Sequence, residues 1–287
     1  MLPKFGGLGG RVRKSDKSDL AKLEAILQAQ RKRGGLWRIL RQGFWGLLIV
    51  AVLVASLRTA EVSPQEFLKG LPRLGDWLRR LWPPDFTELP SFMEAIWETL
   101  AIAIVGTGAA IVVAVPLAIL VARNITPLAG LATLLRGFSN ILRGIDTAIF
   151  ALVFVSIVGL GPFAGVLGVA FHTTGSMAKL YTEVLETIPP EPIEAIEATG
   201  SDRLRTFAFA VLPEALPGLI GVTLYLWEFN VRSSVILGIV GAGGIGYELL
   251  VSLKLLDFPR LTTILILILT MVSLIDALSA YLRQRLT

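Results

Sequence analysis

Polar and charged side chains interrupt the long apolar stretches of this sequence at positions that could carry chemistry. They are Arg143, Asp146, His172, Thr173, Thr174, Glu228, Asn230, Arg232 and Ser233. A charged side chain at the centre of a bilayer costs about 2.5–3.5 kcal/mol on insertion scales, so it normally faces a partner or a water-filled cavity. Guanidinium, imidazole and hydroxyl groups offer donors and positive potential, which a small hydrated oxyanion needs along its route. These residues are therefore candidates for lining a translocation pathway.

The spacing of the charges allows a second interpretation that needs no substrate. Asp146 follows Arg143 by three residues and Arg232 follows Glu228 by four, so each pair would share one helix face. Ion pairing within each helix would then neutralise both arginines for structural reasons. For His172 the corresponding alternative is a hydrogen-bonded packing role. On the sequence alone both interpretations stay open.

One polar segment, residues 188–213, has the features of two short helices outside the membrane. A cluster of prolines ends the preceding apolar stretch and favours a new first helical turn. Glu194 lies near that helix N-terminus, and Gly200 permits the left-handed conformation that ends a helix. Small residues such as Ala195 and Thr199 suit a surface that another protein contacts closely. A simple cytoplasmic connector is the alternative.

Composition places these residues in a membrane protein. Hydrophobic residues make up 54% of the 287, charged residues only 17%, and mean hydropathy is +0.69. A soluble chain of this length needs roughly 25% charged residues to cover its surface. The apolar residues also fall in blocks long enough to cross a bilayer, which indicates a polytopic membrane protein. The net charge is +5, and the basic residues cluster at the ends of the blocks and in the first forty residues. In a membrane protein this distribution indicates topology, so no nucleic-acid partner is expected.

The same composition excludes several kinds of chemistry. The sequence has no cysteine and one histidine, so disulfide scaffolds, iron–sulfur centres, thiolate zinc sites and multi-histidine metal sites are ruled out. Residues 241–246 match the pattern G-x-G-x-x-G, but a dinucleotide site would need a βαβ unit and an acidic residue about 20 positions later. We expect no metal, no cofactor and no catalytic residue in this chain.

Apolar blocks predict six membrane-spanning helices. They cover residues 37–57, 91–122, 131–159, 163–187, 212–240 and 261–282. Lysine and arginine are more frequent in the segments that lie inside when both termini are cytoplasmic, which sets the orientation. The expected organisation is a basic cytoplasmic tail, an extra N-terminal span, a periplasmic segment and a core, at 1–36, 37–57, 58–90 and 91–287. Segment 188–213 then faces the cytoplasm.

That cytoplasmic segment resembles the signature of permease subunits of bacterial ABC importers. The matching positions are Glu194, Ala195, Ile196, Gly200, Ala210, Leu212 and Pro213. Ile196 stands where that signature has a second alanine, and Ala210 where it has a larger aliphatic residue. In that family the loop docks into a cleft of the cytoplasmic ATPase and passes its closure to the spans. The resemblance implies an ATPase-coupling role for Glu194, Ala195, Thr199, Gly200, Leu212 and Pro213.

Further runs resemble phosphonate and phosphite permeases, from about Pro83 to the C-terminus. These runs are residues 159–167, 172–175, 229–233 and 240–246. The resemblance implies an all-α integral membrane fold, with six transmembrane helices, a type I ABC importer (MetI-like) permease core and a cytoplasmic coupling-helix loop. It also implies a pathway for phosphonate, phosphite or a related small oxyanion.

The partners are implied by the same resemblance. Two copies of the chain would enclose one pathway in the lipid of the bacterial inner membrane. Two cytoplasmic subunits would bind ATP and Mg²⁺, and a periplasmic binding protein would deliver the substrate. The chain itself would be a non-catalytic, multi-pass subunit without a cofactor, and both of its termini would be cytoplasmic.

Two other functions compete with this one. A secondary transporter or channel for a small anion could use Asp146, His172 and Glu228 as a proton relay. Against it, the two halves of the sequence show no inverted-repeat symmetry. A membrane-embedded enzyme, such as a phosphatase using His172, would need a nucleophile and a base beside the imidazole. The sequence offers no such set.

Overall fold

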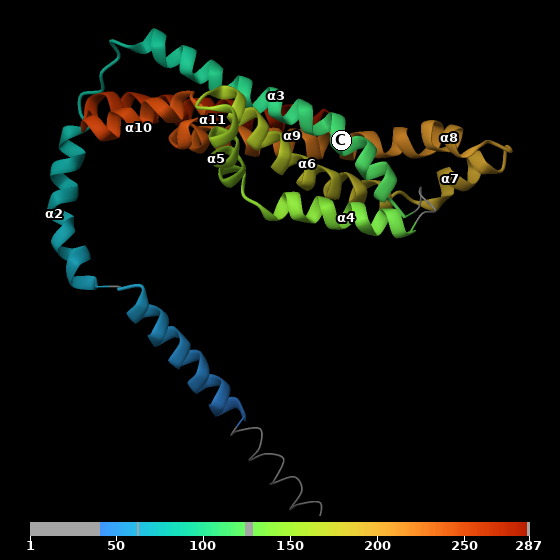
Figure 1. Cartoon of the computed structure of the whole chain (residues 1–287), viewed down its shortest axis with the longest axis horizontal. Coiled ribbons are helices and arrows are strands. Elements are labelled where there is room, and N and C mark those ends of the chain that lie inside the picture. The colour runs from blue at the N-terminus through green and yellow to red at the C-terminus, as the bar shows by residue number, and fades with distance from the viewer. Residues whose placement is uncertain (1–40, 62, 124–128, 286–287) are drawn as a thin grey trace, which may run out of the picture. The chain divides into compact units, whose positions relative to one another are not determined.

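The structure is a computed structural model that describes residues 41–61, 63–123 and 129–285 (Figure 1). All regular elements in these ranges are helices. The chain divides into two units, Met1–Leu74 and Gly75–Thr287, and each is described by itself.

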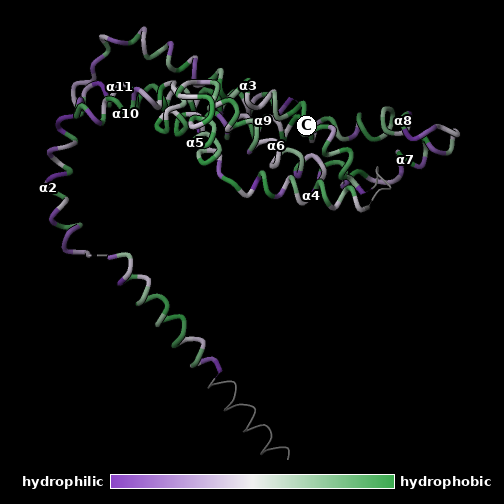
Figure 2. Tube along the Cα trace, in the orientation of Figure 1, coloured by the Kyte–Doolittle hydropathy of each residue, from purple (hydrophilic) through white to green (hydrophobic). Residues whose placement is uncertain are grey.

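The first unit contains the helix Arg41–Thr59 and the start of α2 (Pro64–Arg80). The helix Arg41–Thr59 is long and apolar enough to cross a membrane (Figure 2). Its side chains are exposed. In α2, apolar and charged residues alternate at helical spacing, so the helix is amphipathic. It forms within the segment 58–90 that was expected to be periplasmic. The expected tail, 1–36, lies outside the described residues.

The second unit is a helical bundle built around one central helix, α6 (Figure 1). The helices that contact α6 are α3, α4, α5 and α9, and α11 packs on α9. Their bounds are α3 Leu89–Val121, α4 Ala129–Gly144, α5 Thr147–Val158, α6 Pro162–Glu186, α9 Leu212–Leu237 and α11 Phe258–Gln284. Small residues let these backbones approach closely, as is usual for helices packed in lipid.

Glycines mark the closest approaches to α6. A Cβ built on Gly106 of α3 would lie 2.7 Å from the Cβ of Val169 on α6. A Cβ on Gly175 of α6 would lie 2.6 Å from both the amide nitrogen of Arg143 and the carbonyl oxygen of Ser139 on α4. Any larger residue at either position must therefore push two helices apart.

Four helices among the described residues are long and apolar enough to cross a membrane. They are Arg41–Thr59, α3, the continuous helix Arg203–Ala242 that contains α9, and α11. The bent pair of α4 and α5 brings this number to five if it is counted as one span. Helix α6 is 25 residues long but carries several Thr, Gly and Ser residues, most of them buried. Because it is surrounded by other helices rather than by lipid, it does not need a fully apolar surface.

The expectation of one straight helix through residues 131–159 is wrong. Helix α4 ends at Gly144, α5 begins at Thr147, and the two axes differ by 86°. The carboxylate of Asp146 accepts a hydrogen bond from the amide of Ala148 at 2.8 Å and so caps the N-terminus of α5. Arg143 and Asp146 consequently do not share a helix face.

Short elements lie at the two ends of this bundle (Figure 1). At one end are α7 (Pro190–Glu197) and α8 (Arg203–Thr206), and at the other is α10 (Ile245–Leu255). Two π-helical turns, η1 (Phe207–Val211) and η2 (Gly238–Ala242), join α9 to its neighbours.

The glycine-rich run 241–246 forms the turn that begins α10. Gly241, Gly243 and Gly244 all have positive φ angles, which L side chains rarely adopt. The amide of Gly244 donates to a carboxylate oxygen of Glu98 at 3.0 Å, and the amide of Ile245 donates to the hydroxyl of Thr99 at 2.9 Å. Side chains of α3 therefore cap α10.

We predict that Gly106→Ala destabilises the protein and that Gly108→Ala does not. The new methyl group at 106 would collide with Val169, at a cost of about 1–3 kcal/mol for overpacking. At 108 no atom lies within 4 Å of the added Cβ, so only the gain in helix propensity of about 0.5–1 kcal/mol remains. Thermal unfolding of the purified variants measures both. Equal midpoints would contradict the close packing of α3 on α6.

Candidate functional site

Helix α7 presents the residues that were expected to couple to an ATPase. None of its residues is buried, and Glu194, Ala195, Thr199 and Gly200 are exposed. Gly200 has φ of +78°, and the hydroxyl of Thr199 donates to the carbonyl of Ile196 at 2.7 Å, so both shape the turn after α7. Leu212 and Pro213 are also exposed, at the start of α9.

Apolar residues on both arms of the α7–η1 segment have two different roles. Ile193 on α7 and Phe207 on η1 pack against the core cluster that includes Met177, so they hold the segment on the bundle. Leu204 and Phe209 are instead 76% and 71% exposed. Exposed apolar side chains on a polar projection are typical of a contact with another protein. The sequence analysis did not single out Leu204 and Phe209, although both are large apolar residues in a polar segment.

A clamp of charged groups lies directly before α7. Glu186, the last residue of α6, accepts hydrogen bonds from the amide of Arg123 at 2.9 Å and from the guanidinium of Arg136 at 2.6 Å. The same guanidinium donates to the carbonyl oxygen of Val121 at the end of α3. The end of α3, the middle of α4 and the end of α6 are thereby tied together. Sequence reasoning missed this role of Arg136 because Glu186 lies 50 positions later.

The break between α4 and α5 brings Arg143 and His172 into one region. Nδ1 of His172, on α6, lies 2.8 Å from the carbonyl oxygen of Ile145, the residue between the two helices. His172 thereby satisfies a backbone carbonyl that the broken helix leaves without a partner. No ion pair among the described residues includes Arg143.

Two adjacent pockets open beside this break. One has a volume of about 290 Å³ and lies between α4, α6 and α9; its polar and aromatic lining comprises Arg143, His172, Ser176, Lys179, Tyr225 and Phe229. The other, of about 420 Å³, shares Arg143 and Lys179 with it. This larger pocket also contains Glu183 and Glu186, which neutralise its basic residues. The smaller pocket has no acidic residue in its lining.

Asn230 and Thr173 lie inside the bundle, away from both pockets. The amide nitrogen of Asn230 donates to the hydroxyl of Thr107 at 2.8 Å, and the hydroxyl of Thr173 donates to the amide oxygen of Asn230 at 3.1 Å. All three residues are at most 3% exposed. They form a buried polar link between α3, α6 and α9, in which each side chain satisfies another. The hydroxyl of Thr174 bonds back to the carbonyl of Ala170.

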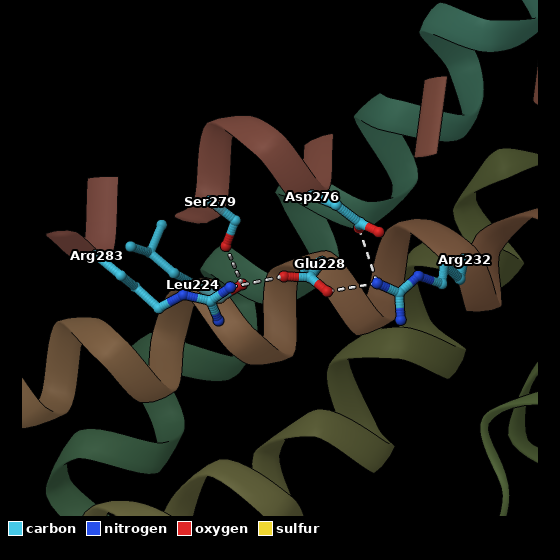
Figure 3. Close-up of polar contacts among 6 residues, drawn as sticks. All are labelled: Leu224, Glu228, Arg232, Asp276, Ser279 and Arg283. Atoms are coloured by element: carbon cyan, nitrogen blue, oxygen red, sulfur yellow. Dashed lines mark hydrogen bonds and ion pairs between the residues drawn. The ribbon is translucent and has the colours of Figure 1, made fainter. Parts of the chain in front are cut away.

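Arg232 lies in a cluster of alternating charges between α9 and α11 (Figure 3). Its guanidinium contacts Glu228, one turn earlier, and Asp276 at 2.7 Å. Glu228 in turn accepts from Arg283 at 3.2 Å. Two positive and two negative groups therefore balance one another, as the structural interpretation of Arg232 required. Ser233 is half-buried and lines neither pocket.

Sequence reasoning did not find Asp276 and Arg283 as partners of this cluster. Asp276 lies in the last apolar stretch and Arg283 directly follows it, and the sequence analysis used arginines at such positions only to set the orientation. An acidic residue inside an apolar stretch was the available signal for Asp276. Which arginine it pairs with depends on the register of α9 against α11, which the sequence does not contain.

Comparison with known protein families matches residues 114–287 to the family described as "Binding-protein-dependent transport system inner membrane component". A putative phosphite transport system permease protein, HtxC, from Stutzerimonas stutzeri is 38% identical and covers 91% of this chain and 93% of its own. The phosphite transport system permease protein PtxC of the same organism is 36% identical and covers 87% and 90%. The phosphate-import permease protein PhnE of Mycolicibacterium smegmatis is 39% identical, and its match covers 87% of this chain and 47% of its own.

Solved structures share the fold of the bundle. Two crystal forms of the MetNI methionine ABC transporter in inward-facing conformations match with TM-scores of 0.60 and 0.63. They are 27% and 26% identical to this chain, and cover 68% and 71% of it and 96% and 99% of their own chains. The prediction of an all-α membrane fold with a MetI-like core agrees with these matches.

The family match covers more than half of the chain, and the relatives cover nearly all of it. Proteins of this family are generally non-catalytic and work together with substrate-binding proteins and ATPases. The chain belongs to the family of binding-protein-dependent transport system inner membrane components, and it is a multi-pass permease subunit that provides the translocation pathway of an ABC importer.

Proposed function

We propose that this permease passes phosphonate, phosphite or a related small oxyanion through the membrane. The observation that carries the proposal is the 290 Å³ pocket, which contains Arg143 and Lys179 and no carboxylate in its lining. Such a pocket stabilises an anion that has lost part of its hydration shell. The names of the relatives support the same class of substrate, since two are phosphite permeases and one imports phosphate.

The pathway residues divide into two groups in this proposal. Arg143 and His172 line the route directly, because both border the basic pocket. Most of the remaining candidates hold the route in shape. They do so through a helix cap, a buried polar link and the charge cluster, and they are Asp146, Thr173, Glu228, Asn230 and Arg232. Thr174 bonds back within α6, and Ser233 borders neither pocket.

The finer topology is also part of the proposal. Six spans result if α6 and the bent α4–α5 pair each cross the bilayer, with both termini in the cytoplasm. Helix α7 and α10 lie at opposite ends of the bundle, which supports placing them on opposite sides of the membrane (Figure 1). Two copies of the chain enclose one pathway, and a periplasmic binding protein delivers the anion to it.

The driving force comes from two partner ATPase subunits that hold ATP and Mg²⁺. Each docks on the exposed face of α7, with Glu194, Ala195, Thr199 and Gly200, and on Leu212 and Pro213. A displacement of α7 reaches the bundle through Ile193, which packs against the core, and through the Glu186–Arg136 clamp, which joins α3, α4 and α6. ATP binding thus favours one of two pathway conformations, because the ATPase subunits bind ATP tightly only when the permease is in that conformation.

The substrate proposal is tested by the ATPase activity of the reconstituted complex with its binding protein. Phosphonate, phosphite, hypophosphite, phosphate and sulfate are supplied one at a time. We expect at least one reduced-phosphorus anion to stimulate hydrolysis and sulfate not to do so. If an assembled complex responds to none of the phosphorus anions, the substrate class is wrong, although the family is not.

For the coupling segment, we predict that Glu194→Arg releases the ATPase and lowers uptake at least tenfold. The change puts a positive charge on the exposed face of α7 without touching the core, since Glu194 is exposed and makes no ion pair among the described residues. Lys254→Glu, a charge reversal at an exposed position on α10 at the opposite end of the bundle, is the control (Figure 1). Co-purification of the ATPase measures binding. Normal binding by the Glu194 variant would exclude this face as the docking surface.

For the topology, we predict that a cysteine at Thr199 reacts with an impermeant maleimide only from the cytoplasmic side. The chain has no native cysteine, so a single introduced thiol reports one position. A cysteine at Lys254, which is exposed on α10, reacts only from the outside. Labelling of intact and of permeabilised cells distinguishes the two sides. The reverse pattern would invert the proposed orientation.

A further inference from the structure

The basic pocket contains a hydrogen-bond acceptor as well as cations. A backbone carbonyl can only accept, so the contact between Nδ1 of His172 and the oxygen of Ile145 requires a hydrogen on Nδ1. In the neutral imidazole the other ring nitrogen, Nε2, is then an acceptor with a free lone pair. No described residue forms a hydrogen bond with Nε2, and the ring borders the pocket.

The positions of the cation and the acceptor are fixed relative to each other. Arg143 lies in the last turn of α4, and His172 lies on α6. Gly175, one turn after His172, brings α6 so close to α4 that an added Cβ would lie 2.6 Å from the amide nitrogen of Arg143. The contact with Ile145 holds the imidazole on the same break. Both groups therefore face the pocket from backbones that pack directly on each other, which is what a selective site needs.

The neighbouring pocket lacks this combination. There Arg136 is paired with Glu186 at 2.6 Å, and Lys179 with Glu183 at 3.6 Å. These carboxylates repel an anion and compete for the same donors. Arg143 and Lys179 border both pockets, but only the smaller one adds His172 and has no carboxylate in its lining. An anion is therefore held better in the smaller pocket.

We propose that the pocket formed by Arg143 and His172 selects an oxyanion that carries an O–H group while ionised. Arg143 donates to the charged oxygens, and Nε2 of His172 accepts the hydrogen of the O–H. Hydrogen phosphate and the monoanions of phosphite and phosphonates have such a group, whereas sulfate and hypophosphite do not. The inference rests on the proposed function and narrows it to the protonated forms of these anions.

Direct binding to the permease–ATPase complex without the binding protein tests this inference. The matched probes are inorganic phosphate and sulfate at mildly alkaline pH, where both are tetrahedral dianions and only phosphate has an O–H. One hydrogen bond to a charged ligand changes affinity by about tenfold, so we expect calorimetry to show about tenfold tighter binding of phosphate. Equal binding of the two probes, or no binding of either, would overturn the inference.

Two variants separate the roles of the two residues. His172→Asn keeps an N–H that can donate to Ile145 and removes the acceptor at Nε2, so the phosphate-to-sulfate ratio should fall towards one. Arg143→Gln should weaken both anions similarly and leave the ratio unchanged. A merely structural role of His172 would lower both affinities together at a constant ratio, which would overturn the assignment.

The lipid in the assay distinguishes a free anion from a lipid headgroup. Nanodiscs of phosphatidylcholine contain only a phosphodiester, which has no P–O–H group to compete. Adding phosphatidate, whose headgroup has one, should leave phosphate binding unchanged if the pocket belongs to the pathway. Loss of phosphate binding with phosphatidate would assign the pocket to lipid instead. None of these results depends on the stimulation of ATP hydrolysis, so a failure here leaves the substrate class of the importer to its own test.

Discussion

Close packing around α6 is the constraint on which the rest of the structure depends. Helices in lipid attract one another mainly through van der Waals contact and a few hydrogen bonds, so their backbones must approach closely. Gly106 and Gly175 leave no room for a Cβ on the sides where α3 and α4 meet α6. The location of Arg143, the orientation of His172 and the starting point of α7 all follow from the path of this one helix.

With the bundle in place, most polar groups in the apolar stretches have a structural partner. Asp146 caps α5, Asn230 links three helices, and Arg232 balances two carboxylates on α9 and α11. Each arrangement removes the cost of an unpaired polar group in a medium of low dielectric constant. Arg143 differs because none of the described residues neutralises it. This difference, rather than the presence of a charge, is the reason why Arg143 is proposed for the pathway and the other residues for the scaffold.

The same packing connects the end of the bundle that carries α7 to the pocket. Glu186, the last residue of α6, binds Arg123 just after α3 and Arg136 in the middle of α4, and α7 begins four residues later. Lys179 and His172 lie on the same α6, nearer the break. In the proposed coupling, a helix that carries both the clamp and the pocket transmits a displacement of α7 without a separate relay. Movement of α6 against α4 would change the distance between Arg143 and His172.

The sequence by itself determined the class of the protein, and it predicted the segment 188–213 as the one that couples to an ATPase. Long apolar blocks indicate membrane-spanning segments, and the spacing from Glu194 to Pro213 lies within one short segment. Neither signal depends on contacts between residues that are distant in the sequence. It did not determine the break at Ile145, because a glycine and a capping aspartate in an apolar run are compatible with a straight helix as well as a bent one. The partners of Arg136 and Arg232 are 50 and 44 residues away, on other helices. Only the tertiary structure decided them, since the register between helices is set by packing at glycines and not by the order of residues along any one helix.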